Sequence, residues 1–423
     1  MSQYATARTS NAWTGLFENA LIVAIAGGFA NLLNLGTTFF VARLLAPANY
    51  GAYSQLVGVY FVVALPGSAL GVAVVRRAGY YIVHGDHVLT MHWQKRLHRR
   101  VALAAFACAI GLLPLSILAA NWLGHRSWVA VWMVSLAGLT FAVLSVDRAL
   151  LQSRQRYVAL SWNFAFEGVA RVVFTLIGVS FGVIGFTVGL LLAELATRWH
   201  AYQMVRLRFE VDEGIEIEHT GITSELAVAL VTLGLMAVLQ FLDVFVIGHA
   251  NAGHAGSYTA ISQISKTIVY GAVILSSFLL PETVLASRKG AEVLRQLGVV
   301  LGLLALPAIG LVLLANAFAQ KLLTTVFGAR YSHAAASLPT LVYAMIALAI
   351  STILVTFLLG DGARWPTLWI ALCVGVGIVW VNGGHGLWLV TARRDLQVQV
   401  VTMIGLTVAA GWRLRRQHVR ARL

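Results

Sequence analysis

Charged residues are scarce in this sequence. Aspartate, glutamate, lysine and arginine make up only 11% of its 423 residues, whereas 59% are hydrophobic and the mean hydropathy is +0.81. A soluble protein of this length cannot bury so much apolar surface in one core. Because a membrane-spanning helix needs about 20 apolar residues, the composition indicates an all-α integral membrane protein with about twelve transmembrane helices.

Residues and motifs that would bind a metal or a nucleotide, or form a disulfide, are also few. The two cysteines, Cys108 and Cys373, lie inside apolar runs, which favours packing over a disulfide or a metal site. His84 and His87 in "HGDH" lack the fixed spacing of a zinc ligand set. The sequence has no Gly-Lys-Ser/Thr phosphate loop. We therefore expect no metal, no cofactor and no direct use of ATP.

Twelve apolar segments follow one another, joined by short links. They lie at about 16–42, 51–75, 101–122, 128–149, 159–180, 183–205, 225–248, 257–281, 297–317, 336–359, 366–388 and 397–412. Most of the 30 lysines and arginines fall in alternate links and in the C-terminal tail. The positive-inside rule then places both termini in the cytoplasm. In a membrane protein the net charge of +14 indicates contact with anionic lipid and not with nucleic acid.

Acidic residues gather in one polar stretch near the middle of the chain, "RLRFEVDEGIEIEHTGITSE". It divides the sequence into an N-terminal six-helix lobe, 1–206, a cytoplasmic linker, 207–224, and a C-terminal six-helix lobe with a basic cytoplasmic tail, 225–423. Only Asp395 is expected in an outer loop. An enzyme would place catalytic acids and bases in sizeable outer loops, so the chain is not expected to be an enzyme.

The first outer link is similar in sequence to a link in the second half of the chain. "VARLLAPANYGAYSQL" at 41–56 and "VIGHANAGHAGSYTAI" at 246–261 occupy equivalent places, and three residues recur as Val41 and Val246, Gly51 and Gly256, Tyr53 and Tyr258. Internal repeats are common in transporters. Tyr50 and Tyr53 are of the type that lies at the headgroup interface.

Four blocks in order resemble a known family. These are "ARLLAPANYGAY", "LLQSRQRYVALSWNFAFEGVARV" from Leu150, "GVIGFTVGLLLAEL" from Gly182 and "VFGARYSHAAASLPTLVYAM" from Val326. Together they resemble the polysaccharide-type flippases of the multidrug/oligosaccharidyl-lipid/polysaccharide exporter superfamily. The resemblance covers roughly residues 15–360. The region "VNGGHGLWLVTARRDLQVQVV" departs from the family pattern before the last span.

This resemblance implies a V-shaped transporter with two pseudo-symmetric lobes around a central cavity. Its cargo would be an oligosaccharide on a polyprenyl diphosphate, a repeat unit of O-antigen (lipopolysaccharide), capsule or exopolysaccharide. Alternating access would move it from the inner to the outer leaflet of a bacterial inner membrane. Membrane lipids and glycan-assembly proteins would be partners, and coupling to H+ or Na+ is left open.

Charged residues within spans are the first candidate site residues, because each needs a partner or water. The resemblance places Lys266 in a cavity-lining span, where its ammonium would attract the cargo diphosphate. Asp243 is a candidate proton or sodium coupling site, and a salt bridge between the two is the alternative. Glu167 and Arg171, spaced i,i+4, are either a structural pair or groups for coupling and for binding sugar hydroxyls.

Weaker candidates lie in the first two spans and in the sixth. Asn31 and Asn34 share a helix face and would bind cargo hydroxyls or join neighbouring helices. Glu18 would gate the cytoplasmic mouth, or lie at the headgroups. Arg76 and Arg77 would guide the diphosphate inward, or only set topology. Glu194 and Arg198, also i,i+4, are interpreted as an interfacial pair.

Two other functions compete with flipping. An ion-coupled antiporter of cationic drugs, from the same superfamily, would favour acidic or aromatic groups in the cavity. A membrane glycosyltransferase or polymerase would use the same lipid-linked substrates, but the short outer loops count against it.

Overall fold

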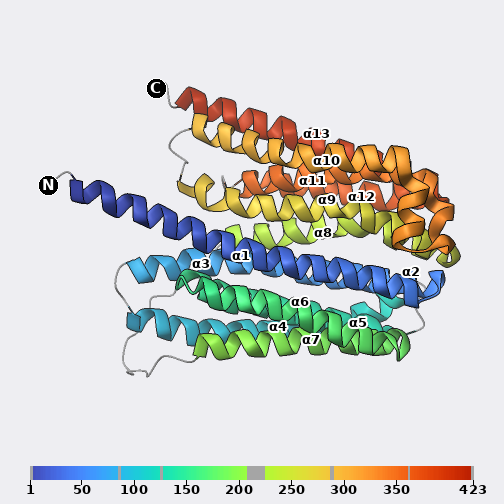
Figure 1. Cartoon of the computed structure of the whole chain (residues 1–423), viewed down its shortest axis with the longest axis horizontal. Helices are drawn as coiled ribbons and strands as arrows, with labels where there is room; N and C mark the ends of the chain where they lie inside the picture. The colour runs from blue at the N-terminus through green and yellow to red at the C-terminus, as the bar shows by residue number, and fades with distance from the viewer. Residues whose placement is uncertain are drawn as a thin grey trace. The chain divides into compact units, whose positions relative to one another are not determined.

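The chain folds almost wholly into helices. A computed structural model describes the backbone of residues 3–83, 87–123, 127–206, 224–285, 290–360 and 363–420. The helices of these ranges are α1 (Gln3–Leu44), α2 (Pro47–Ala64), α3 (Pro66–Val83), α4 (His87–Leu123), α5 (Trp128–Ser153), α6 (Tyr157–Val179), α7 (Gly182–Arg206), α8 (Ser224–Ala250), α9 (Ala252–Leu285), α10 (Gly290–Val326), the 3₁₀ helix η1 (Ala329–Ser337), α11 (Leu338–Gly360), α12 (Trp365–Asn382) and α13 (Trp388–Arg420) (Figure 1).

The all-α membrane class predicted from composition is confirmed. Ten candidate spans within the described residues are long and apolar enough to cross a membrane. Each apolar segment of the sequence becomes a helix, and the second is broken at Leu65 into α2 and α3. Pro47 and Pro66 each begin a helix, where a missing backbone N–H costs nothing.

The end of the chain differs from the prediction. Helix α12 ends at Asn382 and α13 begins at Trp388. Arg393, Arg394 and Asp395 therefore lie in the first turns of α13, and the prediction that Asp395 sits in an outer loop is wrong. Periodicity could not show this, because the three charges interrupt the apolar pattern that marks a span.

The described chain divides into two compact units. Unit 1 comprises Met1–Val41, Val63–Ala119 and Ser127–Ile222; unit 2 comprises Ala42–Val62, Ala120–Arg126 and Thr223–Leu423. Residues 42–62 and 120–126 thus cluster with the C-terminal half. The division predicted at the linker 207–224 remains a prediction, since residues 207–223 lie outside the described residues.

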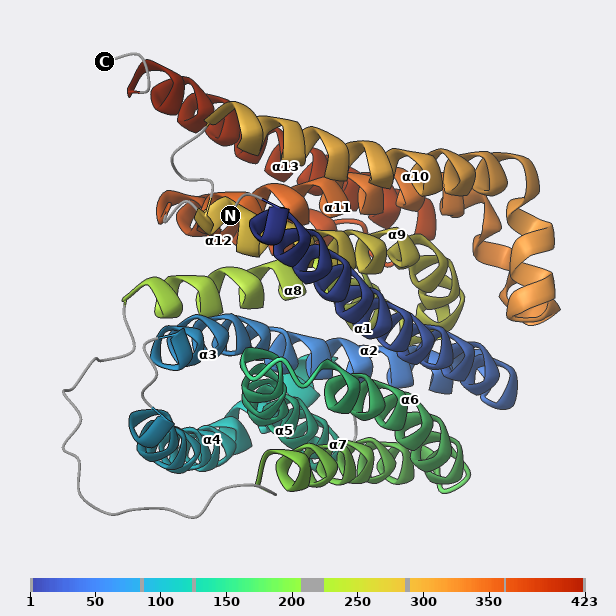
Figure 2. The ribbon, with the colours of Figure 1, turned by 60° about the vertical axis from the view of Figure 1, so that its left-hand side comes forward.

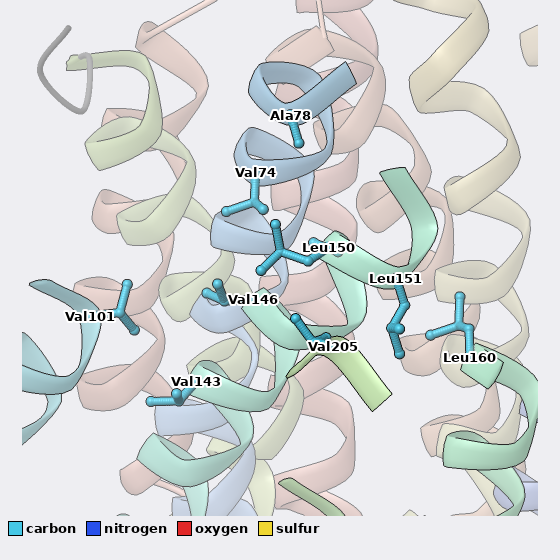
Figure 3. Close-up of a cluster of buried hydrophobic side chains, with 10 residues drawn as sticks. Val74, Ala78, Val101, Val143, Val146, Leu150, Leu151, Leu160 and Val205 are labelled. Carbon is cyan, nitrogen blue, oxygen red and sulfur yellow. The ribbon is translucent and has the colours of Figure 1, made fainter. Parts of the chain in front are cut away.

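Unit 1 has an aliphatic core where α3, α4 and α5 meet the start of α6 and the end of α7. Figure 3 shows this cluster, which is made of Val74, Ala78, Val101, Val143, Val146, Ala149, Leu150, Leu151, Leu160 and Val205. Helices α6 and α7 pack closely through glycines. A Cβ on Gly189 would lie 2.2 Å from the carbonyl oxygen of Phe174, and one on Gly178 would lie 2.3 Å from that of Gly185. Small residues allow such close approach of membrane helices.

Within unit 2, the two similar links around Gly51 and Gly256 lie against each other. A Cβ on Gly51 would lie 2.7 Å from Cβ of Ala255, and one on Gly256 would lie 1.8 Å from the carbonyl oxygen of Pro47. The equivalent glycines thus mark the place where the start of α2 crosses the start of α9. Helices α10, α11 and α13 pack alongside one another in the same unit (Figure 2).

The aromatic residues of the first link are packed against other rings. Tyr50 is fully buried, its ring lies 5.9 Å from that of Tyr53 and 5.6 Å from that of Tyr331. The Tyr331 hydroxyl donates to the carbonyl oxygens of Ala42 (2.7 Å) and Leu45 (3.2 Å). Both rings are covered by protein, and the prediction that Tyr50 and Tyr53 lie at the level of the headgroups remains a prediction.

Arg43 also belongs to this junction. Its guanidinium donates to the carbonyl oxygens of Thr325 and, at 3.1 Å, of Val326, the last residues of α10. A cation there compensates the partial negative charge of a helix C-terminus. Arg330 in turn donates to the carbonyl oxygen of Arg43 at 2.5 Å. Residues 42–53 and 326–331 of unit 2 therefore form one structural junction.

Candidate functional site

The strongest candidate site is a buried group of charges in unit 2. Lys266 of α9 and Asp243 of α8 both have no exposed surface, and Lys266 Nζ lies 3.2 Å from Asp243 Oδ1. The second carboxylate oxygen of Asp243 accepts a hydrogen bond from Ser262 Oγ at 2.9 Å. The Lys266 ammonium also lies 4.3 Å from the centre of the Phe241 ring, an arrangement that stabilises a cation.

A second carboxylate joins this group from α13. Asp395 is fully buried and interacts electrostatically with both Asp243 and Lys266. Its Oδ1 accepts from Gln399 Nε2 at 3.1 Å, and the same amide nitrogen donates to the carbonyl oxygen of Leu239 at 3.1 Å. We call Asp243, Lys266, Asp395 and Gln399 the unit 2 charge cluster.

The unit 2 charge cluster holds two acids and one base. If all three ionise, one negative charge is left uncompensated in a fully buried place. Asp395 Oδ2 and Gln399 Oε1 make no hydrogen bond within the described residues, and the buried hydroxyl of Tyr258 lies beside Asp243 and Asp395. Buried oxygens without donors, beside an excess negative charge, suit a bound proton or a small hard cation. No group of three or more His, Cys, Asp or Glu with metal-binding geometry occurs among the residues that the structure describes.

Unit 1 contains a second buried network, but its charges balance. Glu167 of α6 accepts from Arg148 (2.6 Å) and Arg171 (2.8 Å), and Arg171 also reaches Glu194 of α7 at 2.6 Å. Arg148 donates to Asn163 Oδ1 at 2.7 Å. Two arginines and two glutamates thus alternate across α5, α6 and α7. We call them the unit 1 ion-pair chain.

A further pair continues this polar region. His98 Nε2 lies 2.6 Å from Asp147 Oδ1, and His98 Nδ1 lies 3.0 Å from the carbonyl oxygen of Gln94. Arg198 Nε lies 4.0 Å from the other oxygen of Asp147. Both ring nitrogens of His98 face acceptors, which fits a protonated imidazole.

Two pairings inferred from sequence can be compared with these contacts. The Glu167–Arg171 pair forms as the i,i+4 spacing indicates. The Glu194–Arg198 pair is wrong, because α7 turns Glu194 toward Arg171 and leaves Arg198 beside Asp147. Spacing along one helix cannot show a better partner on a neighbouring helix. The Lys266–Asp243 salt bridge, the alternative to cargo binding by Lys266, is present.

The remaining predicted site residues are scattered. Asn31 is exposed and Asn34 half-buried on α1 of unit 1. The side chains of Glu18, Arg76 and Arg77 lie outside the described residues, as do residues 84–86 of the histidine-rich stretch. The roles predicted for all of these residues, and for Arg171, remain predictions.

Sequence reasoning missed several members of the two networks. Asp395 falls in a predicted outer loop, and Gln399, inside the predicted span 397–412, carries no charge that marks a site. Asp147 and Arg148 close the predicted span 128–149, where a charge usually marks only the end of a span. The usable signal is the pair of adjacent charges "DR", whose arginine lies five residues before the end of α5.

Comparisons with known proteins find likeness in structure and not in sequence. No family model and no curated protein matches the chain. An inward-facing multidrug resistance MATE family transporter of the MOP superfamily superposes with a TM-score of 0.68 at 12% identity, over 94% of this chain and 99% of that one. Its outward-facing counterpart gives 0.61 at 15% identity, over 94% and 96%.

A third solved structure agrees. A MATE protein in complex with MaD3S gives a TM-score of 0.67 at 14% identity, over 94% of this chain and 95% of that one. The alignments cover nearly the whole of each chain, so the two-unit helical architecture as a whole is shared. The protein is a multi-pass membrane protein with the fold of the MATE transporters.

Proposed function

We propose that this protein is an ion-coupled antiporter that exports amphipathic organic compounds across a membrane. The unit 2 charge cluster carries the proposal. An antiporter needs a site whose occupation by H+ or Na+ changes the energy of a conformational transition. A buried group with one excess negative charge and unpaired oxygens meets that need, because its stability depends on whether a cation is present.

The MATE fold supports the same proposal. The solved relatives include proteins described as multidrug transporters in inward-facing and outward-facing conformations. On this proposal the predicted drug-antiporter alternative takes precedence over flipping of a lipid-linked oligosaccharide. Lys266 is then a partner of Asp243, and the candidate coupling residues are Asp243 and Asp395.

Asp395→Asn is the most informative variant. It removes one negative charge and leaves the Lys266–Asp243 salt bridge in place, whereas Asp243→Asn would strand a buried ammonium. Purified protein is reconstituted into liposomes loaded with a fluorescent lipophilic cation, and a proton or sodium gradient is imposed. Wild type should extrude the dye faster with one gradient than with none, and Asp395→Asn should lose that acceleration by about tenfold or more.

Thr407→Val, an exposed change on the same helix, is the control and should transport like wild type. Extrusion by Asp395→Asn that still follows the ion gradient would remove the unit 2 charge cluster from the mechanism. Extrusion by wild type that ignores both gradients would remove ion coupling itself.

Flipping of a polyprenyl-diphosphate-linked oligosaccharide is the second candidate. The ordered sequence blocks favour it, as does the exposed amide of Asn31 inside a span, where polar side chains usually face water or cargo. Lys266 contributes less to this candidate than the sequence indicated, because it is buried and paired.

Deletion of the gene in its host separates the two candidates. A flippase mutant accumulates the lipid-linked oligosaccharide on the inner leaflet and loses surface glycan. An antiporter mutant keeps normal glycan and becomes more sensitive to lipophilic cations. Complementation with wild type should restore whichever phenotype appears.

A further inference from the structure

An apolar groove lies between α12 and α13 of unit 2. It has a volume of about 380 Å³ and is lined by Trp369, Leu372, Cys373, Val376, Trp380, Gln397, Val398 and Val401. The α12 residues recur at i, i+3, i+4, i+7 and i+11, so they form one face of that helix. Leu372, Val376 and Trp380 are exposed.

Both ends of the groove are closed by tryptophans. At one end Trp369 packs on Gly405, where a Cβ would lie 2.2 Å from its indole nitrogen, and donates to the carbonyl oxygen of Thr402 at 3.3 Å. At the other end Trp380 donates to Gln397 Oε1 at 2.8 Å. Trp380 follows Trp369 by eleven residues, which is roughly 16 Å along the helix, a length that suits one hydrocarbon chain.

Two arginines flank the Trp380 end. The Arg394 guanidinium lies 5.1 Å from the centre of the Trp380 ring and donates to the Trp380 carbonyl oxygen at 2.8 Å. Arg393 precedes it in α13 and is exposed. No ion pair joins either arginine to an acid of the described chain, and the adjacent Asp395 is buried in the unit 2 charge cluster. One hydrogen bond uses few of the five guanidinium donors of Arg394.

We propose that this groove binds an anionic phospholipid of the surrounding bilayer, with one acyl chain between the tryptophans and the phosphate at Arg393 and Arg394. Any membrane helix is covered by lipid, but this groove has two features that favour one kind of lipid. Its concave apolar wall accommodates an acyl chain, and the two arginines at one end attract a negatively charged headgroup. This assigns a role to the arginine pair, which the predicted topology otherwise places against the positive-inside rule.

Native mass spectrometry of the purified full chain tests the proposal. The protein is titrated with phosphatidylglycerol and, separately, with phosphatidylcholine of the same chains. Wild type should retain one phosphatidylglycerol about 10- to 30-fold more tightly than phosphatidylcholine, and the double variant Arg393→Gln, Arg394→Gln should abolish that difference. Val376→Trp should fill the groove and weaken binding of both lipids.

Matched controls keep the result interpretable. Val379→Trp introduces the same bulk on an exposed part of α12 outside the groove, and Arg415→Gln removes a cation elsewhere on α13; both should bind like wild type. Phosphatidylglycerol with a photoreactive acyl chain should label peptides of α12 and α13 in wild type and in these controls, but not in Val376→Trp.

Three outcomes would overturn the proposal. Equal retention of the two phospholipids by wild type would show that charge plays no part. Unchanged labelling in Val376→Trp would place the lipid elsewhere. Displacement of phosphatidylglycerol by equimolar polyprenyl phosphate would assign the groove to a cargo-like lipid and not to a resident phospholipid.

Discussion

At the residue scale, the molecule is distinguished by two groups of buried charges. Burying an ion costs several kcal/mol, and a nearby opposite charge recovers this only with good geometry. The unit 1 ion-pair chain has balanced charges and short contacts, with distances of 2.6–2.8 Å. The unit 2 charge cluster has an excess acid and a longer contact of 3.2 Å. The first is suited to holding helices together and the second to binding a cation.

Glu167→Gln tests the structural role of the unit 1 ion-pair chain. The change leaves Arg148 and Arg171 buried with one compensating acid fewer, so the free energy of unfolding should fall by about 3–5 kcal/mol. Thermal unfolding in detergent measures this. Lys321→Gln, an exposed charge in α10, should change the midpoint little. A Glu167→Gln protein as stable as wild type would contradict the structural role.

For Asp395, in contrast to Glu167, removal of the charge is not expected to destabilise the protein. Because Asp395→Asn removes an excess charge and preserves the Lys266–Asp243 pair, it should leave the unfolding midpoint equal to or above that of wild type. Unfolding is followed at several sodium concentrations. Wild type should gain stability with added cation if the site binds Na+, and the variant should not; a marked loss of stability in the variant would instead identify Asp395 as a structural partner.

At the element scale, the helices are held by close backbone contacts at glycines. Lipid is as apolar as a leucine side chain, so helices in a membrane associate through tight packing and hydrogen bonds. The crossing of α2 and α9 at Gly51 and Gly256 is such a contact. It lies beside the aromatic junction of Tyr50, Tyr53 and Tyr331.

Gly256→Val tests this crossing. The added side chain would overlap the Pro47 carbonyl, from which even a Cβ would lie 1.8 Å away, so α2 and α9 should separate and stability should fall by about 1–3 kcal/mol. Gly253→Ala is the matched control, because its Cβ would meet only Asn251 Oδ1 at 3.4 Å. Both variants are compared by thermal unfolding and by transport. Equal midpoints would show that the crossing tolerates separation.

At the scale of the whole molecule, the membrane determines the orientation of the chain. The basic residues of alternate links and of the C-terminal tail predict that both termini lie in the cytoplasm. A green fluorescent protein fused after residue 423 should fluoresce and an alkaline phosphatase there should be inactive, while fusions in the link at 383–387 should show the opposite. Phosphatase activity at the C-terminus would reverse the predicted topology.

The sequence blocks that carry the family resemblance coincide with residues that pack the fold. The blocks at 42–53 and 326–345, on which the resemblance partly rests, meet in one junction through Arg43, Tyr50 and Tyr331. They encode packing that the fold requires. They therefore predict the architecture, which the MATE structures share, and say little about which cargo is carried.

The sequence by itself determined the all-α class, the membrane and the order of the helices, because each depends on local composition and on the length of apolar runs. It also predicted the Glu167–Arg171 pair and allowed for the Lys266–Asp243 salt bridge. Only the tertiary structure decided that Asp395 joins Asp243, that Glu194 faces Arg171 and that Tyr50 is buried. These depend on how helices far apart in the chain rotate against each other, and neither spacing nor composition along one helix contains that information.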